Sequence, residues 1–349
     1  MNEQDAANVL VQQIEAEAFR LGFCSFGVTS ADPPKNHPIY EDWLAAGLNG
    51  GMKYMESERH RKYRQDPHLL FGKVKSIVVL GWPYPLTKQT EKRAGGWIAG
   101  YATQPDYHER LTGPLSALAD FINEKSGGKC ESRIYTDSAP ILERELGERA
   151  GLGWIAKNSC LISPEAGSNF LLAEIFLSTR LPESAPFGFE RCGTCRRCID
   201  ACPTHCIRAD RTIDAGRCIS YLTIENKGAI PLELRESVGE WVFGCDICQT
   251  VCPWNMRTGK LEHDVVKHAL MTCEEMVHDL ALGAEDFKAK FNGSPLLRAK
   301  RKGTLRNLAT VLTNEREVTA VAALNRLMER EEDADLRETL RWALDTLRE

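Results

Sequence analysis

The stretch Cys192-Gly-Thr-Cys195-Arg-Arg-Cys198-Ile-Asp-Ala-Cys202-Pro203 decides how the middle of this 349-residue chain folds. Its intervals of two, two and three residues, closed by a proline, are the spacing with which bacterial ferredoxins hold [4Fe–4S] clusters. A second run, Cys245-x2-Cys248-x3-Cys252-Pro253, repeats the ending without a leading cysteine. Cys218, which lies between the runs, can supply that ligand through a long loop. The spacing therefore predicts two clusters and one-electron transfer.

The cysteine that precedes proline binds the other cluster in two-cluster ferredoxins. We therefore predict a first set of thiolates formed by Cys192, Cys195, Cys198 and Cys252. The second set is then Cys202, Cys218, Cys245 and Cys248. Structural zinc is the alternative, but zinc sites commonly use two separated pairs of ligands, which does not explain two Cys-x2-Cys-x3-Cys-Pro endings.

The chain has 13 cysteines, an odd number that disulfides within one chain cannot pair completely. Its first residues are polar and acidic and lack the pattern of a signal peptide, and no run of 18 apolar residues follows. We therefore predict a cytoplasmic protein in a reducing compartment, without a membrane partner. Five cysteines are expected to be bystanders, with Cys206 packed in the core: Cys24, Cys130, Cys160, Cys206 and Cys273.

Hydrophobic periodicity predicts an α+β fold with three domains, 1–185, 186–260 and 261–349. The first domain is expected to be α/β, with helices over 7–21 and 140–150 and strands over 23–29, 76–80, 133–136, 154–162 and 170–177. The second is the ferredoxin-like, two-cluster domain. The third is helical, with a capping box at Thr272 and Glu275. Its last two amphipathic segments, 318–328 and 336–347, resemble one short HEAT-like helical hairpin.

The net charge of −5 argues against a nucleic-acid partner, but the charges are segregated. Residues 296–306 carry five basic side chains and no acid, whereas residues 315–349 carry a local charge of −4. This basic segment is either a track for phosphates or a solvated turn before an acidic helix. Its basic residues are Arg298, Lys300, Arg301, Lys302 and Arg306.

Several motifs along nearly the whole chain resemble the epoxyqueuosine reductase family. They are Asp106-Tyr107-His108, Tyr135-Thr-Asp-Ser-Ala-Pro-Ile-Leu-Glu-Arg144, Ala150-Gly-Leu-Gly-Trp-Ile-Ala-Lys-Asn158, Pro164-Glu-Ala-Gly-Ser168, Arg217-Cys-Ile-Ser-Tyr-Leu-Thr223, Gly244 to Asn255, and Ser294-Pro295 with Arg298, Gly303, Arg306 and Asn307. The resemblance implies a cobalamin-dependent oxidoreductase with two [4Fe–4S] clusters and an N-terminal cobalamin-binding catalytic domain. Such an enzyme reduces epoxyqueuosine to queuosine at the wobble position of tRNA, the last step of queuosine biosynthesis.

Removal of an epoxide oxygen as water consumes two electrons and two protons. The leaving oxygen therefore calls for an acid whose pKa is raised by burial, and the resemblance implies Asp137 as that proton donor. The alternative role for Asp137 is a helix N-cap, which favours the ionised carboxylate and lowers the pKa. The role of His108 stays open, because it can be either a residue of the active site or a structural residue of the core.

The resemblance also implies contacts with cobalamin. Besides Asp137, the candidates are Arg64, Ala99, Lys157, Asn158, Leu161, Ile162, Ser163 and Leu172. The alternative is a surface role for Arg64 and ordinary strand packing for the apolar members. Candidate tRNA contacts are Glu225, Lys227 and the basic residues of 296–306. The predicted partners are a tRNA with a queuosine-type anticodon and a low-potential electron donor of the flavodoxin or ferredoxin type. We also predict that the protein is a monomer.

Two other functions stay open at this point. One is a related cobalamin and iron–sulfur reductase of a small molecule, similar to reductive dehalogenases. The absence of a twin-arginine signal and the presence of the basic segment argue against it. The other is a non-enzymatic electron-transfer module, against which the large N-terminal domain and Asp137 argue.

Overall fold

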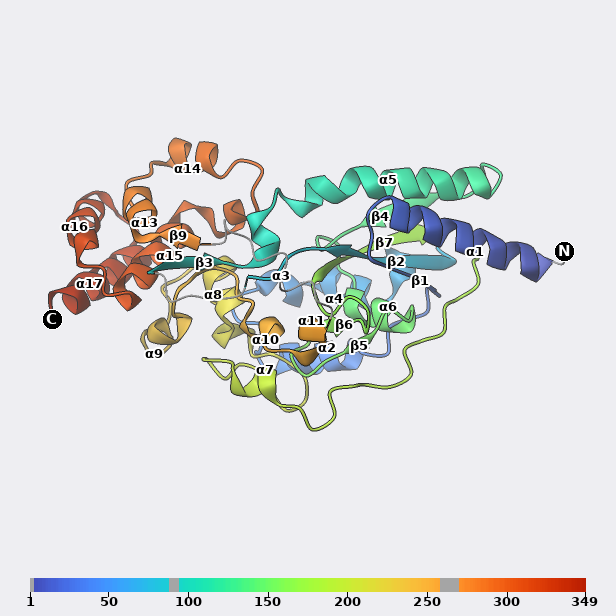
Figure 1. The fold of residues 1–349 in the computed structure, drawn as a ribbon, viewed down its shortest axis with the longest axis horizontal. Coiled ribbons are helices and arrows are strands. Elements are labelled where there is room, and N and C mark those ends of the chain that lie inside the picture. The colour runs from blue at the N-terminus through green and yellow to red at the C-terminus, as the bar shows by residue number, and fades with distance from the viewer. Residues whose placement is uncertain (1–2, 88–93, 258–269) are drawn as a thin grey trace.

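The computed structural model of this chain describes residues 3–87, 94–257 and 270–349 (Figure 1). A four-stranded antiparallel sheet in the order β1-β2-β7-β4 forms the core of the N-terminal part. The β-branched run after Ser76 is fully buried in its second strand, as β-propensity predicts. The strands are β1 Ser25–Thr29, β2 Ser76–Pro83, β4 Ser132–Tyr135 and β7 Phe170–Leu177.

Different helices cover the two faces of this sheet, because successive side chains of a strand point to opposite sides. Val78 of β2 packs with residues of α1 and α5, which lie together along the sheet in Figure 1. Val79 faces the other way and packs with α6. The helices are α1 Glu3–Arg20, α5 Tyr107–Lys125 and α6 Glu143–Arg149.

The predicted strand over 154–162 is wrong as one element. The structure has a short hairpin instead, in which β5 (Trp154–Ile155) pairs with β6 (Leu161–Ile162). Ser159 has a φ of 61°, which turns the chain between the two strands. The other short elements of this part are α2 His37–Ala45, α3 Lys53–Glu56, α4 Glu58–Gln65, η1 Pro67–Leu69 and η2 Gly100–Thr103.

A second sheet takes one strand from each of the three predicted domains. In the order β8-β3-β9, β3 (Gly95–Ile98) pairs with β8 (Trp241–Phe243) and with β9 (Leu270–Thr272). This sheet ties the cysteine-rich part to both neighbours. The helices of that part are short: α7 Arg197–Asp200, η3 Ala215–Arg217, α8 Ile219–Ile224, α9 Leu232–Arg235, η4 Glu236–Val238, α10 Ile247–Thr250 and α11 Pro253–Arg257.

The C-terminal part is helical and packs around α15, whose residues 303–313 are all buried. The predicted capping box of Thr272 and Glu275 is confirmed at the start of α13. In the part of the chain that the structure describes, no helix is both long and apolar enough to span a bilayer. The elements are α13 Cys273–Asp279, α14 Ala284–Lys290, η5 Pro295–Ala299, α15 Lys300–Asn314, η6 Val318–Ala320, α16 Val321–Arg330 and α17 Ala334–Arg348.

Candidate active site

Asp137 lies in a tight loop between β4 and α6, with a φ of 54° that residues other than glycine rarely adopt. The Asp137 N–H donates to Oε1 of Glu143 at 2.9 Å, and Oγ1 of Thr136 donates to the carbonyl of Leu172 at 3.1 Å. Helix α6 begins six residues after Asp137 and has Leu142 at its N-cap position. The alternative that Asp137 caps this helix is therefore wrong.

Two side chains from the start of α5 hold the Asp137 carboxylate. The Tyr107 hydroxyl donates to Oδ2 of Asp137 at 2.5 Å, and Nε2 of His108 lies 3.5 Å from the same oxygen. On the far side of the imidazole, Oδ1 of Asp106 lies 2.7 Å from Nδ1. The four residues form a continuous chain of polar contacts, which assigns His108 to the site rather than to the core.

These contacts move two pKa values in opposite directions. Hydrogen bonding with Asp137 raises the pKa of His108 to about 8. Hydrogen bonding from His108 lowers the pKa of Asp137, and it outweighs the opposing effect of burial. The prediction that burial raises the pKa of Asp137 is therefore wrong. At neutral pH the proton is on the imidazole, and the carboxylate is ionised.

Two acids that the sequence analysis missed lie behind the Asp137 loop. Glu174 of β7 is opposite Tyr135 in the sheet and is completely buried, and neither of its carboxylate oxygens has a hydrogen-bond partner among the described residues. Burial raises the pKa of Glu174 well above its ordinary value, and the neighbouring Glu143 raises it further. Both causes favour the protonated form of Glu174. A lone acid within the apolar strand Phe170–Leu177 was the available signal.

Charged residues from distant parts of the sequence meet near Asp137. Arg298 adds to the lowering of the Asp137 pKa that His108 causes, and its Nε donates to Oε1 of Glu225 at 2.7 Å. Burial raises the pKa of Glu143, and the charge of Arg64 opposes that rise. The structure therefore brings Arg64, Glu225 and Arg298, which were predicted from separate segments, into the surroundings of Asp137.

The first predicted set of thiols is assembled from both cysteine runs. Cys192 and Cys252 pack in one apolar cluster with Trp154, whose indole N–H lies 3.5 Å from Sγ of Cys192. Burial, together with the neighbouring Cys192, Cys252 and Cys195, raises the pKa of Cys198 to about 11. The last cysteine of the second run thus lies with the first three of the first run.

The second predicted set is assembled in the same way. Cys202, Cys218 and Cys248 share a packing cluster, and burial together with the charges of the neighbouring Cys218 and Cys202 raises the pKa of Cys245. Each thiolate of a cubane binds a different iron, so four such thiolates stand farther apart than around one ion. Within the described residues, no three His, Cys, Asp or Glu side chains lie close enough to hold a single metal ion.

Two further thiols lie against the second set. Sγ of Cys206 is 3.4 Å from Sγ of Cys202, and Cys206 is buried, as predicted. Cys160 forms a hydrogen bond with Cys248, which lowers the pKa of Cys160. Cys160 belongs to the segment 157–163, so this segment touches the second set directly.

Two of the residues that resemble cobalamin contacts, Ala99 and Asn158, lie next to the second thiol set. The Ala99 N–H donates to the carbonyl of Phe243 at 2.8 Å, and the Ala99 side chain lies against Gly244, next to Cys245. Nδ2 of Asn158 donates to the carbonyl of Cys248 at 3.4 Å. A redox cofactor held by Ala99 and Asn158 would therefore lie next to the second thiol set, which is the position that the predicted cobalamin requires.

The apolar candidates are covered by α6 or buried nearby. The side chains of Leu161 and Leu172 both approach Gly147, where a β-carbon would lie 2.5 Å from Cδ2 of Leu161. Ile162 is the last residue of β6, and Ser163 comes directly after it. Both side chains are buried.

The structure removes Lys157 from the predicted cobalamin contacts. Its Nζ donates to the carbonyls of Gly193 at 2.6 Å and Cys195 at 2.9 Å, within the loop of the first thiol set. The ammonium group is therefore committed to this loop, where it places a positive charge beside the thiolates. Sequence spacing gave no signal for these two contacts, because Lys157 is separated from Gly193 by 36 positions and from Cys195 by 38.

Comparison with known proteins identifies the family. Residues 64–138 match the family model described as epoxyqueuosine reductase QueG, DUF1730, and residues 191–255 match the 4Fe-4S double cluster binding domain. An epoxyqueuosine reductase of Xanthomonas campestris pv. campestris is 37% identical over 341 residues, which cover 95% of this chain and 94% of that protein. This chain belongs to the epoxyqueuosine reductase family.

Solved members of the epoxyqueuosine reductase family share the fold. The enzyme from Streptococcus thermophilus is 27% identical and matches with a TM-score of 0.85, covering 96% of this chain and 90% of its own. The enzyme from Bacillus subtilis is 29% identical, with a TM-score of 0.85 and coverage of 98% and 91%; its structure has the catalytic aspartate loop swung out of the active site. The mixed α/β fold predicted here is therefore that of the family, and it includes the double-cluster domain.

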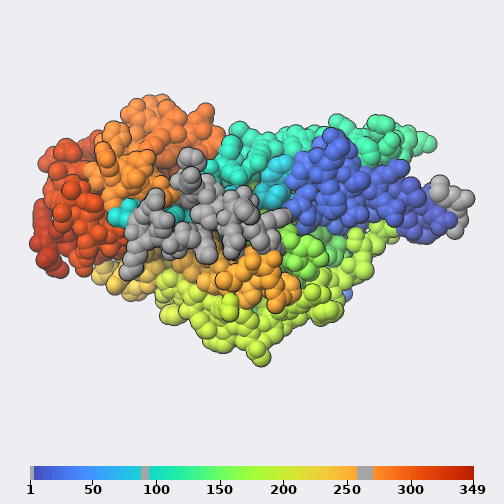
Figure 2. Space-filling model, in the orientation of Figure 1, coloured from blue at the N-terminus to red at the C-terminus, as the bar shows by residue number. Residues whose placement is uncertain are grey.

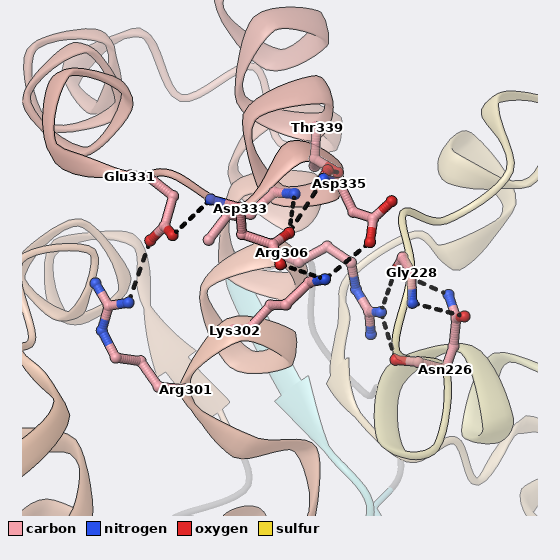
Figure 3. Close-up of polar contacts among 10 residues, drawn as sticks. Asn226, Gly228, Arg301, Lys302, Arg306, Glu331, Asp333, Asp335 and Thr339 are labelled. Carbon is pink, nitrogen blue, oxygen red and sulfur yellow. Dashed lines mark hydrogen bonds and ion pairs between the residues drawn. The ribbon is translucent and has the colours of Figure 1, made fainter.

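Within this family fold, two of the five basic residues of the segment 296–306 pair with acidic C-terminal residues (Figure 3). Nζ of Lys302 lies 2.7 Å from Asp333 and 2.8 Å from Asp335, and Arg301 pairs with Glu331 at 3.2 Å. The two oppositely charged segments are ion-paired with one another. Lys300, by contrast, is exposed and has no acidic partner among the described residues.

Arg306 is removed from the candidate tRNA contacts, because it is only 1% exposed. Its guanidinium donates to the carbonyls of Asn226 and Gly228, both at 2.7 Å, and of Leu222 at 2.6 Å (Figure 3). Burial lowers its pKa to about 10, so it stays charged at neutral pH. Arg306 instead fixes the turn that presents the exposed Lys227.

Proposed function

We propose that this chain reduces epoxyqueuosine to queuosine at the wobble position of tRNA. The observation that supports this most directly is the polar chain in which Tyr107 and His108 hold the Asp137 carboxylate, in a member of the epoxyqueuosine reductase family. The reaction consumes two electrons and two protons. The two thiol sets are suited to hold the iron–sulfur clusters that would pass the electrons. The Asp137 group is suited to supply protons.

Bound cobalamin would supply a strongly reducing centre that accepts electrons singly and acts on the epoxide carbon. Its contacts would come from Arg64, Ala99, Asn158, Leu161, Ile162, Ser163 and Leu172. The two [4Fe–4S] clusters would be held by the eight predicted cysteines and would be reduced by a low-potential flavodoxin or ferredoxin. The cytoplasmic location, the monomeric state and the domain bounds 1–185, 186–260 and 261–349 remain predictions.

The proton for the leaving oxygen is proposed to pass through Asp137 and to come from His108. The Asp137 carboxylate is ionised in the structure, while His108 holds a proton at neutral pH. Tyr107 donates to the same carboxylate oxygen and orients it. Asp106 orients the imidazole from its other nitrogen. In this proposal His108 gives a proton to the Asp137 carboxylate, and Asp137 passes it to the leaving oxygen.

The pH dependence of kcat follows from this arrangement. The His108 pKa is raised from about 6.5 to about 8, so the imidazolium is fully present below pH 6.5 and is lost as the pH rises through 8. We expect kcat to fall over that range and this fall to disappear in His108→Asn, which starts from a lower plateau. A wild-type rate that stays constant from about pH 6.5 to 9 would contradict the role of His108.

The proposed function is tested by anaerobic turnover of tRNA that carries epoxyqueuosine. The protein is reconstituted with iron, sulfide and cobalamin, reduced with dithionite, and the digested tRNA is analysed for queuosine. Visible spectra report cluster and corrinoid binding separately from turnover. A protein that holds both cofactors and forms no queuosine would overturn the proposal.

The proposed tRNA surface consists of Lys227, Arg298 and Lys300, with Glu225 positioning Arg298. A solved relative contains an epoxyqueuosine-modified tRNA stem loop; it is 27% identical, with a TM-score of 0.82 and coverage of 98% of this chain and 100% of its own. Arg298 lies near Asp137, so a phosphate held there would lie close to the proposed reaction site.

Lys300→Ala and Lys302→Ala form a matched pair for this surface. Each phosphate contact contributes about 0.7–0.9 to the slope of log Kd against log salt. We expect Lys300→Ala to reduce that slope by about this amount. Lys302→Ala should change it much less, because Lys302 is already paired with Asp333 and Asp335. Equal slopes for wild type and Lys300→Ala would remove Lys300 from the interface.

A further inference from the structure

An exposed patch of apolar and cationic side chains lies outside the proposed active site. The side chain of Phe189 is 65% exposed, and that of Met256 is 52% exposed. The Arg191 guanidinium lies 5.3 Å from the ring centre of Phe189 and 5.8 Å from that of Trp254. Nη1 of Arg197 approaches Sδ of Met256 at 3.9 Å. We name these side chains, together with Arg257, the arginine–aromatic patch.

The arginine–aromatic patch surrounds the first thiol set. Arg191 and Arg197 immediately precede Cys192 and Cys198 in the sequence, and Trp254 follows Cys252 by two residues. In Figure 2 the yellow-green surface of the first cysteine run adjoins the orange surface of the second.

The loop that carries the first set is also more exposed than the segments around the second set. The thiols of Cys192, Cys195 and Cys198 are half-buried, and the intervening Gly193 and Thr194 are exposed. In the second set, by contrast, Gly244 and Asp246 on either side of Cys245 are buried, and so is Thr204 beyond Cys202. Electrons from outside therefore enter most directly at the first set.

The charge of the patch is positive, although the chain carries −5 overall. Arg191, Arg197 and Arg257 have no acidic partner among the described residues, and the ammonium group of Lys157 lies behind them in the cluster loop. The nearby acids are neutralised: Glu190 pairs with Arg211 at 3.2 Å, and Asp200 pairs with Arg196 at 3.3 Å. A positive patch on an acidic protein attracts an acidic partner in one orientation.

We propose that the arginine–aromatic patch is the docking site for an acidic, one-electron carrier protein that reduces the cluster of the first thiol set. This rests on the proposed function, and it assigns the place where the electron donor binds. Exposed Phe, Trp, Met and Arg side chains are the types enriched at protein interfaces. Redox partners commonly bind through small, transient interfaces, which a few exposed side chains can form. RNA is the alternative occupant, because arginine and aromatic side chains also bind it.

The test uses the charge reversals Arg191→Glu and Arg197→Glu, singly and together, in the full chain. Arg341→Glu is the matched control, because it makes the same charge change at an exposed position of α17. The probe is a purified acidic flavodoxin, titrated at several salt concentrations. We expect the double variant to raise the Kd for flavodoxin by about tenfold or more and to flatten its salt dependence. Phe189→Ala, at a highly exposed position, should weaken binding without changing that salt dependence.

Turnover with two reductants separates this proposal from the proposed function. Dithionite-driven turnover, iron content and tRNA affinity should match wild type in the double variant, whereas flavodoxin-driven turnover should show a raised KM for flavodoxin. Unchanged flavodoxin affinity would overturn the docking site, and a loss of tRNA affinity instead would assign the patch to RNA. If wild type turns over with neither reductant, the proposed function fails, while the binding measurement still tests the patch.

Discussion

Asp137→Asn is expected to lower kcat for epoxyqueuosine reduction by about 10²–10⁴-fold, the usual contribution of a positioned general acid. Asparagine keeps the shape of the side chain but cannot take a proton from His108 and pass it to the leaving oxygen. Iron content, the corrinoid spectrum and tRNA affinity should be unchanged, because none of the described cluster thiols contacts Asp137. The measurement is queuosine formed per enzyme under single-turnover conditions.

Ser138→Ala is the matched control for this prediction. Ser138 is an exposed residue of the same loop, and its hydroxyl only donates to the carbonyl of Thr136. This variant should retain wild-type turnover. A normal rate for Asp137→Asn would place the acid elsewhere, and the polar chain would then point to Tyr107 or His108 as the group to examine.

Loss of one cluster cysteine is the second large effect that we expect. Cys252→Ala and Cys202→Ala should each remove about half of the iron and nearly all turnover, because electrons pass through both clusters. Cys273→Ala should retain full iron, since Cys273 lies at the start of α13, outside both thiol sets. Iron content and the visible cluster band are the measurements.

Double variants test the crossing of ligands between the two runs. The structure puts Cys252 with Cys192, so Cys192→Ala combined with Cys252→Ala should lose no more iron than either change alone. Cys192→Ala combined with Cys202→Ala should remove almost all of it, because these two neighbours in one run belong to different sets. The reverse pattern would mean that each run holds its own cluster.

The backbone elements were largely predictable, because they depend on local pattern. The spacing of Ala7 to Leu21 predicted α1, and the apolar run after Ser76 predicted β2. The hairpin of β5 and β6 was not predictable, because a short apolar segment has the same residue pattern whether it forms one strand or two strands joined by a turn. The reversal depends on the positive φ of Ser159, which sequence period does not reveal.

The candidate site was predictable in its membership and less so in its chemistry. Asp137 and its motif were recognised by resemblance, but the direction of its pKa shift depends on His108, which is 29 residues away in the sequence and in contact in space. Lys157 and Arg306 show the same limit. Both are basic residues in suggestive motifs, and both are committed to backbone carbonyls of distant segments.

The sequence by itself predicted the cluster thiols and their division into two sets, and it carried the family motifs, because ligand spacing along a loop is local geometry. Only the tertiary structure decided which charges are available. It paired Lys302 with Asp333 and buried Arg306, so neither side chain is free to contact a phosphate. Among the described residues, it left Arg191 and Arg197 beside the first set without an acidic partner. Charges act through space, over distances that a linear chain does not encode.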